Sequence, residues 1–150
     1  MKKLLRNDIF FAEAERLLAQ GRSVTLRVKG DSMRPMLRDG LDRVTIRRHS
    51  PDEIEKGAVF LFRHKGAYVM HRIKAVADDE IVFAGDGNYR TEEHVRRDDI
   101  TAKAVRITRP DGRVIDCAGL RWRTMSAAWL GLPPFARRCI LGFFKRLNNN

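Results

Sequence analysis

The sequence predicts a mostly β fold, in which a coiled antiparallel sheet or a partial barrel lies between an N-terminal amphipathic helix and a C-terminal helical segment. Short segments of alternating apolar and polar residues, separated by Gly, Pro and Asp turn signals, predict the strands. Sustained helical spacing of apolar residues occurs only towards the two ends. With 150 residues, 43% of them hydrophobic, the chain can form one core. We expect residues 1–21 to form the first helix, 22–120 the β domain and 121–150 a basic, aromatic C-terminal segment.

The first predicted element is an amphipathic helix over residues 8–20, because apolar residues recur there at intervals of three and four. The residues that share its apolar face are Phe10, Ala14, Leu17 and Leu18. Asn7 or Asp8 can cap the start of this helix, and Gly21 ends it.

Five segments then have the alternation, or the β-branched and aromatic content, of strands. They are residues 24–28, 43–47, 58–64, 67–76 and 80–86. Lys65-Gly66 predicts a hairpin turn, and Pro110-Asp111-Gly112 predicts another one further along the chain. Residues 50–57 have the signature of a capped helical turn, with a serine before it and a glycine after it.

The C-terminal segment combines aromatic and basic residues at helical spacing. Its aromatic residues are Trp122, Trp129, Phe135, Phe143 and Phe144, and Pro133-Pro134 interrupts it. The chain has a net charge of +11, and residues 103–150 contain ten basic and two acidic residues. Such a segment suits a helix lying in a membrane surface, or aromatics packed on the β core, and both interpretations stay open. Nucleic-acid binding through the basic ends is the weaker third interpretation.

The sequence contains no run of about 18 uncharged apolar residues and no signal-peptide pattern. We therefore expect a cytoplasmic protein, with peripheral membrane contact through the C-terminal segment as the alternative. The four histidines and two cysteines match no metal-ligand spacing, so we expect no metal and no cofactor.

The segment K-G-D-S-M-R-P-M-L-R-D-G, residues 29–40, contains more than a turn between strands requires. A large apolar residue, Met33, stands beside the hydroxyl of Ser32. A serine nucleophile presented by the turn explains this composition, whereas the simpler interpretation is an ordinary connecting turn with additional side chains. Because a serine is a poor nucleophile until a base takes its proton, the first interpretation requires a base elsewhere in the chain.

His71 is the best candidate for that base. The period of a strand puts it on one face with Val69 and Ile73, which indicates at least partial burial. A core histidine with a purely structural role gives the same pattern. Asp86, in G-D-G-N, offers a carboxylate that could orient the imidazole, or it is an ordinary turn residue.

These segments, taken in order, resemble the serine peptidases that comprise the type I signal peptidases and the LexA-like repressor peptidases. G-D-S-M-R-P-M-L-R-D-G is similar to their nucleophile box, and K-G-A-V-F-L-F-R resembles the strand after it. V-M-H-R-I resembles the base segment of the endoplasmic-reticulum and archaeal signal peptidases. F-A-G-D-G-N resembles their Lys-Gly-Asp-x-Asn segment, and R-R-D-D-I-T-A-K-A-V resembles the closing strand of their core. The resemblance covers about residues 22–107 and implies their fold.

The resemblance implies a role for each matched residue. Ser32 would be the nucleophile and His71 the general base. Asp86 would orient the base or support the site, with Glu92 as the competing acid. The backbone N–H groups of Ser32 and Asp31 would donate hydrogen bonds to the oxyanion. Because imidazole side chains generally titrate near pH 6.5, a histidine-based enzyme should gain activity through roughly pH 6–7.

Two departures from the family pattern keep other functions open. Signal peptidases usually have a membrane anchor before the box, where this chain has an amphipathic helix, and some carry a hydroxyl residue where this chain has Gly30. We therefore weigh a serine endopeptidase, which would cleave an extended peptide or precursor, against an inactive peptide-binding module of the same fold. A small cytoplasmic precursor or leader peptide is as plausible a substrate as a secretory one.

Overall fold

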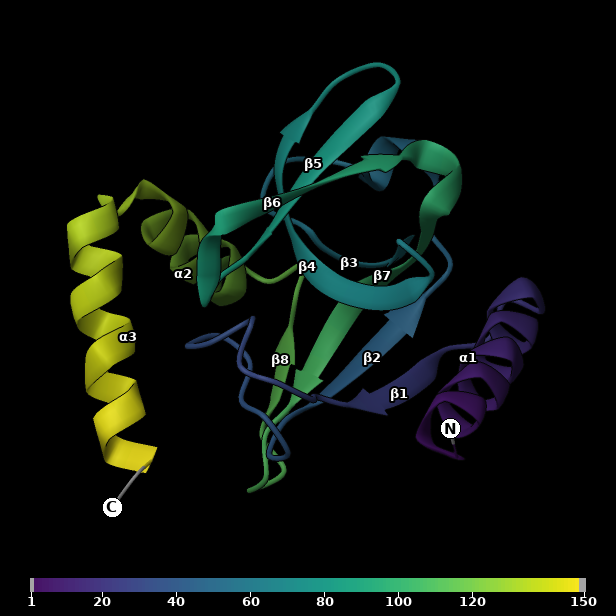
Figure 1. The fold of residues 1–150 in the computed structure, drawn as a ribbon, viewed down its shortest axis with the longest axis horizontal. Coiled ribbons are helices and arrows are strands. Elements are labelled where there is room, and N and C mark those ends of the chain that lie inside the picture. Colours follow the sequence, from purple (N-terminus) through teal and green to yellow (C-terminus); the bar gives the residue numbers. More distant parts are fainter. Residues whose placement is uncertain (1, 149–150) are drawn as a thin grey trace.

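A computed structural model describes residues 2–148 and contains one antiparallel sheet flanked by helices (Figure 1). The N-terminal helix is α1 (Lys2–Ala19). The strands are β1 (Val24–Arg27), β2 (Arg43–Arg47), β3 (Val59–His64), β4 (Ala67–Val76), β5 (Glu80–Gly85), β6 (Asn88–Arg96), β7 (Ile100–Thr108) and β8 (Val114–Asp116). Two short 3-10 turns, η1 (Pro51–Glu53) and η2 (Arg97–Asp99), connect strands, and α2 (Leu120–Gly131) and α3 (Pro134–Asn148) complete the fold.

The sheet has the strand order β1-β2-β7-β3-β4-β5-β6, and β8 pairs with β7. It is not closed, since β1 and β6 lie at the two ends of this order. Register shifts interrupt the pairs β2–β7, β3–β7, β4–β5 and β5–β6. Bulges of this kind increase the local twist and bend a strand, which gives the sheet its curvature. The predicted class, a mostly antiparallel β domain with helices at both ends, is confirmed.

Strand β4 lies between two hydrophobic clusters, one on each face. Tyr68 and Met70 pack against the cluster that contains Met33, whereas Val69 and Ile73 belong to the cluster that contains Phe62. This is the alternation that the sequence predicts for Y-V-M-H-R-I-K. Because both faces are covered, His71 and Arg72, which follow one another in the chain, are both buried.

The sequence pattern does not predict one of the strands, β6. β6, N-Y-R-T-E-E-H-V-R, is polar at most positions because it lies at an end of the sheet, and only two of its residues, Glu93 and Val95, are buried. Strand prediction relies on apolar alternation, which is weak here. The helix α1 also begins earlier than the predicted residue 8.

The aromatic residues of the C-terminal segment divide into two groups. Trp122 and Trp129 of α2 are buried, as the packing interpretation requires. Phe135, Phe143 and Phe144 of α3 stay exposed, and α3 stands out from the sheet at one side of the molecule (Figure 1). Within residues 2–148, no helix combines the length and the apolar character needed to cross a bilayer.

Candidate active site

The loop that carries Ser32 is anchored by its own apolar residues. Met33, Met36 and Leu37 are at most 5% exposed and belong to the cluster on the inner face of β1 and β2. Leu37 N–H donates to the Met33 carbonyl at 2.9 Å, which closes a turn around these side chains. Ser32 is left half-buried at the start of that turn. The apolar residues of the box therefore have a physical role: they hold the hydroxyl-bearing residue in a fixed position.

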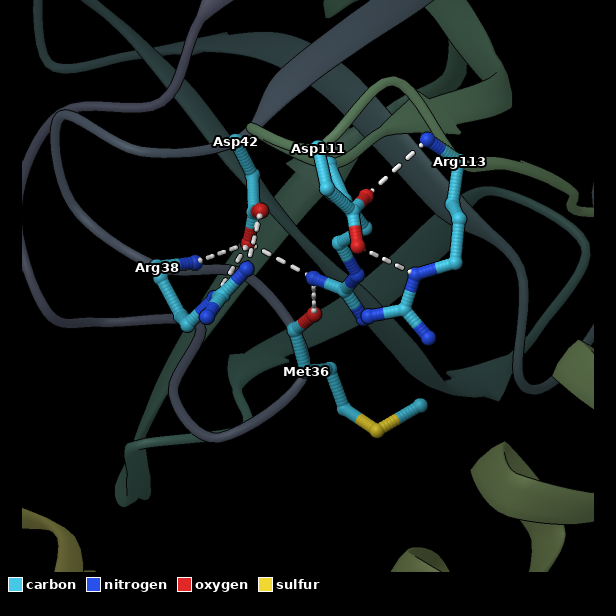
Figure 2. A network of polar contacts seen from close by, with 6 residues as sticks. Met36, Arg38, Asp42, Asp111 and Arg113 are labelled. Carbon is cyan, nitrogen blue, oxygen red and sulfur yellow. Dashed lines mark hydrogen bonds and ion pairs between the residues drawn. The ribbon is translucent and has the colours of Figure 1, made fainter.

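A buried carboxylate holds the other end of the loop (Figure 2). Asp42 is fully buried and accepts hydrogen bonds from the backbone N–H of Arg38 at 2.8 Å and from the Arg38 guanidinium. Arg109, just after β7, donates from one nitrogen both to Asp42 at 2.6 Å and to the Met36 carbonyl at 3.0 Å. This cluster ties the Ser32 loop to the end of β7.

His71 faces a carboxylate that the sequence analysis did not select. Its Nδ1 lies 3.0 Å from Oε2 of Glu93, and both side chains are about nine-tenths buried. The contact has the distance of an ion pair, and neither atom forms a hydrogen bond among the described residues. The register explains the meeting, because Ile73 pairs with Phe83 and Phe83 pairs with Glu93, so Glu93 shares the face of Ile73 and His71.

The other ring nitrogen of His71 points towards the Ser32 segment. A Cβ placed on Gly85 would collide with the Ser32 carbonyl oxygen and would lie 3.0 Å from His71 Nε2. The next glycine, Gly87, donates its N–H to the same carbonyl at 2.8 Å. The two glycines of F-A-G-D-G-N thus let the β5–β6 turn approach the backbone of the nucleophile box. The Ser32 carbonyl and His71 Nε2 therefore both lie next to Gly85, which has no side chain.

Asp86 pairs with Arg72 and Glu92 pairs with Lys74, so neither acid is paired with His71, and the position of Asp86 fits the supporting role that was its alternative. Both oxygens of Asp86 accept from Arg72, at 2.8 and 2.7 Å, in a fully buried pair. Arg72 also donates to the Gly57 carbonyl and lies 5.5 Å from the Trp122 ring. Asp86 pairs with Arg72, which points to the opposite face of β4 from His71.

Glu92 lies on the exposed side of β6, where it pairs with Lys74. This ion pair lowers the pKa of the Glu92 carboxyl, mainly through the hydrogen bond from Lys74. The strand period therefore turns Glu92 outward and its neighbour Glu93 inward. The alternation of E-E-H-V, in which Glu93 shares a face with the apolar Val95, is the signal in the sequence that could have identified the buried acid.

The residues expected to stabilise the oxyanion lie at the start of the turn. Asp31 is exposed, and its side chain pairs with Arg34 at 2.8 Å. Its carbonyl accepts from the Arg34 N–H at 3.1 Å, and the Ser32 carbonyl accepts from Gly87. Within residues 2–148, no hydrogen bond is formed by the N–H groups of Asp31 or Ser32. Both groups therefore remain available as donors.

A groove of about 890 Å³ opens beside Ser32. One wall is the edge strand β1, residues 24–27, and another is β4 at Tyr68 and Met70. Helix α1 borders the groove through Phe11, whose ring stacks on Tyr68 with centroids 4.2 Å apart. The groove is mainly apolar, and the candidate nucleophile Ser32 is part of its lining. This shape and lining suit an extended peptide with apolar side chains.

The fold and the site together define a peptidase-like β domain with a serine, a histidine and a carboxylate at its centre. The family model of Peptidase S24-like proteins matches residues 5–107, a span that contains Ser32, His71, Asp86 and Glu93. The chain belongs to the Peptidase S24-like family, which confirms the resemblance to the LexA and signal peptidase superfamily. No curated protein matches the sequence. Helices α2 and α3 lie beyond the matched span.

Proposed function

We propose that this protein is a serine endopeptidase in which Ser32 is the nucleophile, His71 the general base and Glu93 the residue that orients the base. The observation that carries the proposal is the position of the His71 ring. Its Nδ1 lies 3.0 Å from Glu93, and its Nε2 borders the Ser32 segment across Gly85. A base held between an acid and a hydroxyl is the arrangement that activates a serine.

The proposed reaction follows from this geometry. His71 takes the Ser32 proton on Nε2, and Oγ attacks the scissile carbonyl carbon. The N–H groups of Ser32 and Asp31 hold the oxyanion, and Glu93 accepts the hydrogen bond from Nδ1–H as the ring becomes charged. His71 then gives its proton to the leaving amine. Water repeats these steps on the acyl-enzyme and releases the acid.

The groove beside Ser32 supports an extended peptide as the substrate. β1 pairs with β2 on one side only, so its other edge can bind a peptide as an added strand. Main-chain hydrogen bonds to β1 would align the peptide, and its alternate side chains would face the apolar wall at Met33 and Met70. We infer a precursor protein or peptide with an extended, partly apolar cleavage site.

Covalent labelling with a fluorophosphonate tests the proposal. We expect the wild type to be labelled and Ser32→Ala to be unlabelled. In His71→Ala, we expect labelling to fall by roughly 10³-fold or more, because the hydroxyl then has no base. Circular dichroism of each variant checks that the fold is kept. Labelling of Ser32→Ala at the wild-type rate would refute the assignment of the nucleophile.

The inactive peptide-binding module is the second candidate, and Gly30 favours it because a hydroxyl donor to the oxyanion is missing there. That glycine has a positive φ of 84°, and its N–H donates to Asp39 at 2.8 Å, so it serves the loop conformation instead. An unlabelled wild type that still binds extended peptides would establish this second function.

A further inference from the structure

One side of helix α3 is an exposed apolar stripe. Phe135, Cys139, Phe143 and Leu147 follow one another at intervals of four residues and therefore lie on the same side of the helix. The exposed fractions of Phe135, Phe143 and Leu147 are 78%, 60% and 56%, and Cys139 is also exposed. A stripe of this size is unusual on a surface that faces only water.

The charges of α3 have a single sign. Arg137, Arg138, Lys145 and Arg146 are its charged residues, and the helix contains no Asp or Glu. Arg138, Lys145 and Arg146 are exposed beside the stripe. An apolar stripe with basic flanks is the pattern of a helix that lies in the surface of an anionic membrane.

The base of α3 is fixed to the domain by residues on its other side. The Tyr89 hydroxyl donates to the Pro134 carbonyl at 3.0 Å. The Arg137 guanidinium lies 5.3 Å from the Tyr89 ring centroid and donates to the Leu130 carbonyl. Arg137 thus faces the body of the protein and leaves the stripe free. Tyr89 is the second residue of β6, which follows the Gly85–Gly87 turn, so α3 is anchored close to the candidate site.

Other occupants of the stripe fit these observations less well. Two copies of α3 packed stripe to stripe would bring eight cations together with no acid on either helix, which opposes pairing. Nucleic acid would satisfy the cations but would leave the line of apolar side chains exposed. Helix α3 is also too short to cross a membrane, because its 15 residues extend only about 22 Å, less than the ~30 Å hydrocarbon core.

We propose that α3 binds the surface of anionic lipid bilayers, with Phe135, Phe143 and Leu147 inserted among the acyl chains and Arg138, Lys145 and Arg146 at the phosphate groups. The helix lies parallel to the surface and holds the domain there, and the anchor at Tyr89 keeps the Ser32 site next to the bilayer. This inference does not depend on hydrolysis, so it stands or falls separately from the proposed function.

Vesicle co-sedimentation tests the inference with the full chain. We expect binding to phosphatidylcholine vesicles that contain about 30% phosphatidylglycerol and little binding to phosphatidylcholine alone. The double variant Phe135→Ser/Phe143→Ser should bind roughly 100-fold less, since burying one phenylalanine shifts an equilibrium by about tenfold and two are removed. The matched control is Val76→Ser/Val114→Ser, which removes two exposed apolar side chains of the sheet, 41% and 58% exposed, and should bind like the wild type.

A fluorophore on Cys139 gives a second readout at the stripe itself. Burial raises the pKa of the Cys117 thiol to about 12, whereas Cys139 is exposed, so a maleimide dye labels Cys139 selectively. We expect the emission of an environment-sensitive dye to shift to the blue on anionic vesicles. The shift should weaken as salt rises from about 0.05 M to about 0.5 M.

Three results would overturn the inference. The first is a wild type that does not sediment with anionic vesicles, and the second is a Phe135→Ser/Phe143→Ser variant that binds as tightly as the wild type. The third is a dye on Cys139 that reports no change. A dimer in light scattering that the double variant loses, without lipid binding, would assign the stripe to a second copy of the chain. Tight oligonucleotide binding without lipid binding would assign the basic residues to nucleic acid.

Discussion

At the scale of single residues, the identity of the acid beside His71 depends on which of two adjacent positions in β6 faces inward. The sequence offers Ser32 and His71 as candidates, because the first lies in an unusual turn and the second shares a face with apolar residues. The acid does not follow as directly. Asp86 is conspicuous in a Gly-Asp-Gly turn, yet its carboxylate pairs with Arg72, and the carboxylate at His71 comes from Glu93. A one-residue step along β6 decides between Glu92 outside and Glu93 inside.

Gly85 is a residue-scale requirement of the proposed mechanism. In Gly85→Ala, the new methyl group would collide with the Ser32 carbonyl oxygen and press on the His71 ring. We expect the rate of fluorophosphonate labelling to fall at least tenfold, because one of the two must move. We also expect a loss of about 1–3 kcal/mol in the free energy of unfolding, measured with urea.

The control for this variant is Gly131→Ala. Gly131 is the last residue of α2, and a Cβ there meets no atom within 4 Å. The labelling rate and the unfolding midpoint should therefore stay near the wild-type values. A fully active Gly85→Ala would show that Ser32 and His71 do not need this close approach.

At the scale of elements, two polar clusters connect segments that the sequence keeps far apart. Asp42 joins the Ser32 loop to the end of β7, and Glu53 joins η1 to β2 and β7. Patterns of apolar residues predicted most of these elements, since strands and helices are local. These patterns did not predict the two polar clusters, because tertiary packing decides which residues pair with a buried charge. Tertiary packing also makes β6 an edge strand with weak apolar alternation and leaves one side of α3 exposed, so the sequence did not predict these two features either.

Removing the charge of Asp42 should loosen the nucleophile loop. In Asp42→Asn, the guanidinium of Arg109 keeps its place but loses a fully buried counter-charge. We expect the free energy of unfolding to fall by about 3 kcal/mol, measured with urea, and the labelling of Ser32 to slow. Asp111→Asn is the control in the neighbouring turn (Figure 2), because Asp111 pairs with Arg113 in an exposed position and should matter little. If the Asp42→Asn and Asp111→Asn variants were equally stable, the role of Asp42 in holding the Ser32 loop would be contradicted.

Glu53 predicts a pH dependence of stability. The Arg47 guanidinium, followed by the backbone of Ser50 and by Lys103, holds the pKa of this carboxyl well below its ordinary value. The folded state therefore favours the ionised form, and this stabilisation is present above about pH 4.5 and is lost as the pH falls below it.

We expect Glu53→Gln to be less stable than the wild type at pH 7 by about 1 kcal/mol, since the pair is partly open to solvent. The difference should shrink as urea unfolding is repeated towards about pH 3. Asp52→Asn, at an exposed position in the same turn, is the control. A difference that stays constant over this pH range would rule out the ionised Glu53 as its source.

At the scale of the whole molecule, an open, coiled sheet gives the protein an apolar cluster on each face and a free edge at β1. The Ser32 loop closes over the first cluster, the His71–Glu93 pair lies beside the second, and the glycines of the β5–β6 turn bring the two together. The groove along β1 and the stripe of α3 are then two separate surfaces, which we propose bind a peptide and a bilayer respectively. A precursor bound at or near a membrane would use both.

The central claim is that Glu93, rather than Asp86 or Glu92, orients His71 for the activation of Ser32. The most direct measurement is the rate at which fluorophosphonate modifies Ser32 in Glu93→Gln and in Glu92→Gln, which make the same chemical change one residue apart. We predict a fall of roughly 10²–10⁴-fold in Glu93→Gln and a rate within about twofold of wild type in Glu92→Gln. The account would be contradicted by a Glu93→Gln variant that reacts as fast as the wild type while Glu92→Gln is impaired.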